Sequence, residues 1–252
     1  MSETVDVRDL LGYCEQLLEP ETYRDYAPNG LQVEGRRQVR RLVTGVTACQ
    51  DLLDAAVEAG ADAVLVHHGY FWKNEPQVIT GMKRRRIATL LENGINLIGY
   101  HLPLDGHEAI GNNAWLADLM GLNVTERFGH QQLALAGRLE RPGTGGELAA
   151  RLQAELGRTP LVVGPTDRPI ERLGLCTGGA QDMLGEAIDL GLDAFISGEI
   201  SERTTHMARE SGVTYFAAGH HATETGGVRL LGERLAEEFG IEHRFIDIDN
   251  PA

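Results

Sequence analysis

The chain has few cysteines and no long apolar segment. Cys14, Cys49 and Cys176 are its three cysteines, an odd number without the paired spacing of a zinc site or a disulfide framework. We expect reduced core thiols in a cytoplasmic protein. No apolar run reaches the length of a membrane span, and the first residues lack the basic and apolar regions of a signal peptide. The sequence therefore predicts a protein without a membrane segment.

Positive charge is also scarce. The chain has 23 Lys and Arg against 37 Asp and Glu, a formal net charge of −14, which argues against a broad nucleic-acid-binding surface. The one basic run, "MKRRR" at 82–86, could face a phosphate locally, but a solvated helix start is the simpler interpretation. A chain of 252 residues with 42% hydrophobic residues can bury a substantial core.

Short apolar runs followed by turn or helix signals predict strands that alternate with helices. This order favours right-handed crossovers and mainly parallel sheets, that is, an α/β fold. The segment 133–164 adds a strand, a Pro/Gly loop, a helix and a further strand, so it continues the fold. The six predicted strands are 41–48, 62–69, 96–101, 172–179, 193–199 and 214–221.

The strand and helix pattern occurs twice. A shift of 131 positions places Gly60 on Gly191, and it also places the pair at 67–68 on the pair at 198–199. A strand, a helix and a second strand that match in order, with the same turn residues between them, indicate a duplication. We expect one unit over 1–252 made of two similar, intertwined three-layer α/β lobes, approximately 1–125 and 126–252, related by a pseudo-twofold axis. The short segment 133–164 leaves no room for an inserted middle domain.

Histidines and carboxylates follow several of the predicted strands. Ligands of open α/β sheets bind outside the carboxyl ends of the strands. Imidazoles and carboxylates together are ligands for zinc, iron or manganese, and a carboxylate commonly bridges paired ions. The residues at these ends are His67, His68, His101, Asp105, Glu199, His220, His221 and Glu224.

The spacing of these residues favours two ions. Adjacent side chains of a strand point to opposite sides, so His67 and His68 are expected to bind one ion each. A helix beginning near Ala222 places His220 and Glu224 on one side. Pro103 predicts an extended or turned segment before Asp105. The predicted ligands of two divalent ions (Fe, Zn or Mn) are His67, His68, Asp105, His220 and a bridging Glu224.

Three further features leave alternatives open. His101 either binds metal directly or supports a ligand and carries protons. Glu199 either transfers protons or caps the following helix. The stretch "APNGLQVEG" at 27–35 either reaches the site or is a plain loop. The remaining histidines, for which we expect structural roles, are His107, His130, His206 and His243.

Five stretches in order along nearly the whole chain carry a family resemblance: "NGLQVEG", "VHHGYFW", "HLPLDGHEAIGNN", "SGE" and "GHHATE". With them the sequence resembles the YbgI family, the bacterial GTP cyclohydrolase 1 type 2 homologues, whose eukaryotic relatives are NGG-one-interacting factor three-like proteins. The resemblance implies two intertwined α/β lobes with a dinuclear metal site and a toroidal homohexamer, a trimer of dimers. It places the metal ligands on His67, His68, Asp105, His220 and Glu224.

Two functions of different classes fit these residues. The first is a metal-dependent hydrolase acting on a nucleotide or related heterocycle, in which His101 or Glu199 transfers a proton to the leaving group. The second is a non-catalytic metal-binding, metal-handling or scaffold ring. A nucleic-acid-binding ring ranks last, because the chain is acidic and lacks interleaved aromatic and basic residues.

Overall fold

The structure is a computed structural model that describes residues 3–252. The chain forms two compact units. Unit 1 comprises the residues up to Leu104 together with Gly227–Asp249, and unit 2 comprises Asp105–Gly226 together with Asn250–Ala252. This division differs from the boundary expected near residue 125. The segment after 104 already packs into the second sheet, and the chain returns to unit 1 only after that sheet is complete.

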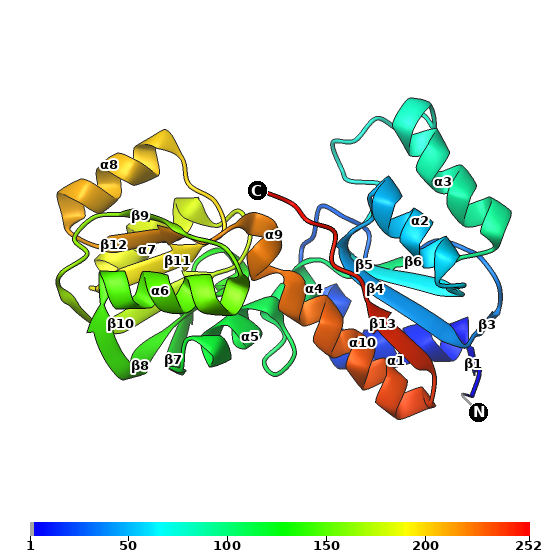
Figure 1. Cartoon of the computed structure of the whole chain (residues 1–252), viewed down its shortest axis with the longest axis horizontal. Coiled ribbons are helices and arrows are strands. Elements are labelled where there is room, and N and C mark those ends of the chain that lie inside the picture. Colours follow the sequence, from blue (N-terminus) through cyan, green and yellow to red (C-terminus); the bar gives the residue numbers. More distant parts are fainter. Residues whose placement is uncertain (1–2) are drawn as a thin grey trace. The chain divides into compact units, whose positions relative to one another are not determined.

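Unit 1 contains a five-stranded sheet in the order β13-β4-β5-β6-β2 (Figure 1). Strands β13, β4, β5 and β6 run parallel, and β2 pairs antiparallel with β6. Helices α2 and α3 bury their apolar sides on one face of this sheet, and Figure 1 shows α1 and α10 on the other. The strands are β13 (Glu242–Phe245), β4 (Arg41–Thr47), β5 (Ala63–His68), β6 (Asn96–Gly99) and β2 (Gly30–Val33); the helices are α1 (Val7–Leu18), α2 (Gln50–Glu58), α3 (Gly81–Asn93) and α10 (Thr225–Phe239); β1 (Val5–Asp6) pairs with β3 (Gln38–Val39).

Unit 2 contains a six-stranded sheet in the order β7-β8-β10-β11-β12-β9. Strands β10, β11 and β12 are parallel, and the outer strands are antiparallel. Helices α5 and α6 pack on one face around Leu116, Leu148 and Leu152. The elements are β7 (Leu122–Phe128), β8 (Ala134–Thr144), β9 (Leu161–Val163), β10 (Pro169–Cys176), β11 (Ala194–Ser197), β12 (Thr214–Ala217), α5 (Asn112–Leu119), α6 (Gly145–Leu156), α7 (Leu184–Asp189), α8 (Glu202–Ser211) and α9 (His220–Thr223). The short helix α4 (Leu102–Gly106) contains the boundary between the two units.

The predicted α/β class and parallel strands are confirmed: the six predicted strands are β4, β5, β6, β10, β11 and β12. The segment 133–164 differs in one detail. The expected loop at Pro142-Gly143 lies within β8, which continues to Thr144 and pairs with β10 across a register shift. Cys14 and Cys176 are buried thiols, as expected for core cysteines, whereas Cys49 is only half-buried.

The two units repeat the same hydrogen bonds at positions 131 apart. In unit 1 the carboxylate of Asp62 accepts hydrogen bonds from the backbone amides of residues 40 and 41, at 2.8 and 2.9 Å. In unit 2 Asp193 accepts from the amides of residues 171 and 172, at 2.9 and 2.8 Å. Gly60 and Gly191 precede these aspartates with φ of 66° and 68°. Such matched contacts support the duplication, while the pseudo-twofold axis stays a prediction.

Candidate metal centre

Three histidines meet at one edge of the sheet in unit 1. His67 and His68 are the last residues of β5, and His101 follows the neighbouring parallel strand β6. One ring nitrogen of each lies within 4.8 Å of the others. The rings of His67 and His68 are 4.6 Å apart between centroids. The two rings therefore converge, and the expectation that they point to opposite sides is wrong, although His68 still pairs with Thr47 as the last residue of β5.

Hydrogen bonds fix the orientation of His67 and His68. Nδ1 of His67 lies 3.0 Å from the carbonyl oxygen of Tyr100, an atom that can only accept. A proton on Nδ1 places the lone pair of this ring on Nε2, which is the form of imidazole that binds a metal. Nδ1 of His68 lies 3.3 Å from the hydroxyl of Thr47. Both rings are thus held by groups on neighbouring strands.

His101 is held by a carboxylate that the sequence analysis missed. Its Nδ1 lies 2.9 Å from Oδ1 of Asp25, whose other oxygen accepts from the amide of Leu102 at 3.0 Å. Burial acts to raise the pKa of Asp25, but the hydrogen bond and charge of His101, with the Leu102 amide, outweigh it and lower this pKa to about 2. Asp25 lies 76 positions from His101 and belongs to no recognisable motif, so only the fold brings it to this position.

The loop at 27–35 contacts this site, which resolves an alternative that the sequence left open. The side-chain oxygen of Asn29 accepts a hydrogen bond from the amide of His101 at 2.8 Å, and the Asn29 amide group donates to Asp25 at 3.2 Å. The turn-forming Asn29 therefore positions both members of the Asp25–His101 pair.

Unit 2 brings together Asp105, His220 and Glu224. Nε2 of His220 lies 3.3 Å from Oε1 of Glu224, which confirms that both side chains lie on one side of the chain. A carboxylate oxygen of Asp105 and one of Glu224 lie within 4.8 Å of each other. Burial raises the pKa of the neighbouring Cys176 thiol, and the charges of Asp105 and Glu224 add to this increase. These two carboxylates form the anionic part of unit 2.

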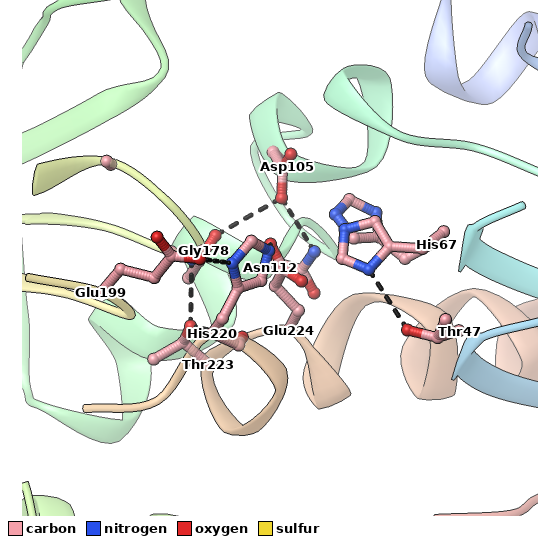
Figure 2. Close-up of polar contacts among 12 residues, drawn as sticks. Thr47, His67, Asp105, Asn112, Gly178, Glu199, His220, Thr223 and Glu224 are labelled. Carbon is pink, nitrogen blue, oxygen red and sulfur yellow. Dashed lines mark hydrogen bonds and ion pairs between the residues drawn. The ribbon is translucent and has the colours of Figure 1, made fainter. Parts of the chain in front are cut away.

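Local structure at both ligand segments differs from the prediction. α9 begins at His220, two residues before the expected start, because Gly219 adopts a φ of 102° that turns the chain directly out of β12. Asp105 lies on the short helix α4, where an extended segment was expected. Pro103 is compatible with this helix, since it occupies the first turn, where its missing amide proton costs no hydrogen bond. Asn112 then donates to Oδ1 of Asp105 at 2.9 Å (Figure 2).

Glu199 pairs with His220 and does not cap the next helix. Oε1 of Glu199 lies 2.7 Å from Nδ1 of His220, on the side of the ring opposite Glu224 (Figure 2). The cap of α8 is Ser201, whose hydroxyl accepts from the amide of Thr204. Burial acts to lower the pKa of His220, but the hydrogen bonds and charges of Glu224 and Glu199 outweigh it and raise this pKa to about 9. The two carboxylates therefore favour the protonated form of His220.

Glycines make room for the acidic group of unit 2. Gly178 has φ of 66°, and a Cβ atom on it would lie 2.2 Å from Oε1 of Glu224. A Cβ atom on Gly198 would lie 2.6 Å from Cα of His220. The 131-residue shift aligns Gly198 with His67, so the duplicated strand end carries a ligand candidate in unit 1 and a glycine in close contact with the backbone of His220 in unit 2.

The donor atoms suit divalent metal ions. Unit 1 presents three imidazoles, each hydrogen-bonded through Nδ1. Unit 2 presents the carboxylates of Asp105 and Glu224 together with the imidazole of His220. Mixed nitrogen and oxygen ligands of this kind are typical of zinc, iron and manganese. Carboxylates behind the imidazoles of His101 and His220 are the usual outer partners of metal-binding histidines. Both groups could therefore bind a metal.

Two other histidines have structural roles, as expected. Nε2 of His243 lies 2.9 Å from the hydroxyl of Thr44, and burial lowers the pKa of His243. Nδ1 of His107 accepts from the amides of Ala109 and Ile110 at 3.1 and 3.2 Å.

Among residues 3–252, no helix is both long and apolar enough to cross a membrane.

Comparisons with known proteins place these residues in a family. The model of the Duf34/NIF3 (NGG1p interacting factor 3) family matches residues 5–251. A Vibrio cholerae protein called "GTP cyclohydrolase 1 type 2 homolog" is 57% identical over 240 residues, which cover 94% of this chain and 95% of that protein. A solved structure described as "protein ybgI, unknown function" has a TM-score of 0.94 and 52% identity, covering 98% of this chain and 100% of that one. A solved structure from Thermus thermophilus has a TM-score of 0.89 and 34% identity, with coverage of 98% and 100%. The chain therefore belongs to the DUF34/NIF3 family.

Proposed function

We propose that the protein binds two divalent ions per chain and is a metal-dependent hydrolase acting on a nucleotide or related heterocycle. The proposed ligands are His67, His68, Asp105, His220 and a bridging Glu224. The observation that carries this proposal is the pairing of an imidazole with a carboxylate in each unit, Asp25 with His101 and Glu199 with His220. The name of the Vibrio cholerae relative, "GTP cyclohydrolase 1 type 2 homolog", supports the reaction class.

The chain's own residues have separable roles in this proposal. Bound divalent ions would supply Lewis acidity and lower the pKa of water at neutral pH. Asp25 holds Nδ1 of His101, so Nε2 is the atom that gives or takes a proton at the leaving group. Glu199 holds Nδ1 of His220 and directs Nε2 of the same ring toward Glu224. His101 and Glu199 are therefore proposed for proton transfer and ligand orientation.

Metal content and turnover measured side by side test the proposal. We expect two ions per chain after anaerobic purification, and turnover of at least one compound in a screen of GTP and related nucleotides. Glu224→Ala should lose metal and turnover together. His101→Ala should keep the metal and reduce turnover, and His206→Ala, a change at an exposed histidine of α8, should keep both.

Three results would change the assignment. Loss of metal in His101→Ala would make His101 a ligand. A metal-free protein that cannot take up ions would rule out the centre. Two ions per chain without turnover of any compound would favour the second function.

The second function is metal binding or handling without turnover, in a scaffold ring. The burial of His67, Asp105 and Glu224 favours it, because buried ligands exchange an ion slowly. A toroidal homohexamer (trimer of dimers) and a cytoplasmic location stay predictions. Slow release of the ion to a chelator, with no exchangeable water detected at the metal, would support this function over hydrolysis.

A further inference from the structure

Aromatic side chains gather beside the three histidines of unit 1. The Trp72 ring lies 5.0 Å from that of His101 and 5.8 Å from that of His68, between centroids. The Tyr26 ring lies 5.2 Å from His101 and 6.0 Å from Trp72. We call Tyr26, Phe71 and Trp72 the aromatic shelf. The rings of Tyr26 and Trp72 touch the side chains that would hold or serve a metal, and Phe71 precedes Trp72 in the same loop.

Two of the three shelf residues are exposed, unlike the other aromatic side chains among residues 3–252. Tyr26 is 51% and Phe71 is 38% exposed, and Trp72 is half-buried. The large rings of Tyr100 and Tyr215, by contrast, are fully buried. Neighbouring apolar side chains that are exposed to solvent often mark a binding site.

The backbone of the shelf is held in an unfavourable conformation. Phe71 has φ of 65°, in the left-handed region that an aromatic residue rarely adopts. Oε2 of Glu75 accepts hydrogen bonds from the amides of Phe71 and Trp72, at 2.7 and 3.2 Å. Nζ of Lys83 lies 3.3 Å from Oε1 of Glu75 and 4.8 Å from the Phe71 ring centroid. Strain that several contacts maintain is characteristic of functional sites.

Further hydrogen bonds join the shelf to the histidines. The amide of Lys73 donates to the carbonyl of Tyr26 at 2.8 Å, which links the two loops that carry the aromatic rings. The amide of Tyr26 donates to Asp25 at 2.7 Å, and Asp25 holds His101. The rings are therefore fixed relative to Nε2 of His101, and a ligand lying on them would be fixed as well.

We propose that the aromatic shelf is a stacking site for the planar ring of the substrate, a purine or a comparable fused heterocycle. This inference rests on the proposed function. Stacking on an aromatic side chain requires only a π-face, so it binds the heterocycle and not its phosphates. Tyr26 and Trp72, which both touch His101, would place the heterocycle next to the group proposed for proton transfer.

Calorimetric titration of the metal-loaded, full-length protein tests the shelf. The ring probes are guanosine, adenosine, cytidine and neopterin, and the ring-free probe is inorganic tripolyphosphate. Tyr26→Leu and Trp72→Leu should each weaken binding of the tightest ring probe about 5- to 100-fold, as expected for a lost stacking partner. Binding of tripolyphosphate and the metal content should not change. Two control variants should bind like the wild type. Tyr26→Phe keeps the ring, and Val78→Ala changes an exposed apolar side chain of the loop that carries Trp72.

Several outcomes would overturn the shelf as a binding site. The first is that the wild type binds none of the four ring probes. The second is that the leucine variants weaken the binding of the ring probe and of tripolyphosphate equally. The third is that Tyr26→Leu loses the metal, which would mean that the ring only supports the structure around the histidines. Tyr26 is half exposed, so Tyr26→Leu remains informative if Trp72→Leu does not fold. Ring binding without turnover would support the shelf and contradict the hydrolase, whereas turnover unaffected by both leucine variants would do the reverse.

Discussion

His101 and His220 share one arrangement at the scale of single residues. In each ring Nδ1 faces a carboxylate, at 2.9 Å from Asp25 and at 2.7 Å from Glu199. An anionic partner raises the basicity of the ring and selects the tautomer that offers Nε2. Asp25 lies in unit 1 and Glu199 in unit 2, so each unit supplies its own supporting carboxylate.

Asp25→Asn removes the charge behind His101 while keeping the shape of the side chain. On the proposed hydrolase function, we expect turnover by the metal-loaded protein to fall about 10- to 100-fold, the usual loss for an outer partner of this kind. Combining Asp25→Asn with His101→Ala should be no worse than His101→Ala alone, because Asp25 acts through that ring. Steady-state rates of the three variants on one substrate measure this, and additive losses would contradict the pairing.

The low pKa of Asp25 also predicts a pH-dependent stability. Its pKa is about 2 in the folded protein against the usual 3.8 of an aspartate, so it stabilises the fold at pH values above about 4, and this contribution is lost as the pH falls toward 2. We expect Asp25→Asn to lower the free energy of unfolding by about 2 kcal/mol at pH 7. Urea unfolding from pH 7 to pH 2 checks this, and a difference from wild type that persists at pH 2 would contradict it.

At the scale of elements, the turn after β10 determines whether Glu224 fits. Gly178 and Gly157 have nearly the same backbone, with φ of 66° and 67°, but a Cβ atom on Gly157 would meet nothing within 4 Å. Alanine at either position would cost a similar amount of backbone strain, but only alanine at Gly178 would displace the Glu224 carboxylate. Comparing the two substitutions therefore isolates the effect on Glu224.

Gly178→Ala should remove or greatly reduce the bound metal, because its Cβ atom would displace the Glu224 carboxylate. Gly157→Ala should cost about 1 kcal/mol of stability through its positive φ and leave the metal content unchanged. Metal analysis and urea unfolding of both variants test this. Equal metal content in the two would show that Glu224 tolerates the displacement.

The sequence predicted the elements better than the contacts between them. Apolar runs and the following helices identified the six parallel strands, because burial on both faces requires such runs. Asp25 was missed, because nothing in a local pattern connects it to a histidine 76 positions away. The helix across Pro103 and the convergence of His67 and His68 depend on tertiary packing at strand ends, where local periodicity carries no information.

At the scale of the whole molecule, unit 2 is nearly continuous in sequence and unit 1 is not. Unit 1 lacks α10 from Gly227 onward and the edge strand β13 until the chain returns to it. Strand β13 pairs with β4 along Glu242–Phe245, so its removal opens the edge of the first sheet.

A fragment of residues 105–226 should therefore fold alone, and a fragment of residues 1–104 should not. Adding residues 227–249 to the fragment 1–104 should restore cooperative unfolding, because these residues supply the missing helix α10 and strand β13. Near-ultraviolet circular dichroism and urea unfolding of the fragments measure this. Cooperative folding of residues 1–104 alone would show that β4 does not need β13.

The return of the chain to unit 1 has a consequence for synthesis on the ribosome. Translation delivers all of Asp105–Gly226 before it delivers α10 beyond Gly226 and β13. The second unit can thus be complete while the first still has an open strand edge at β4, a surface prone to pairing with other chains. Slow translation of the last stretch would prolong this state, so chaperone demand should depend on how quickly Gly227–Asp249 emerges.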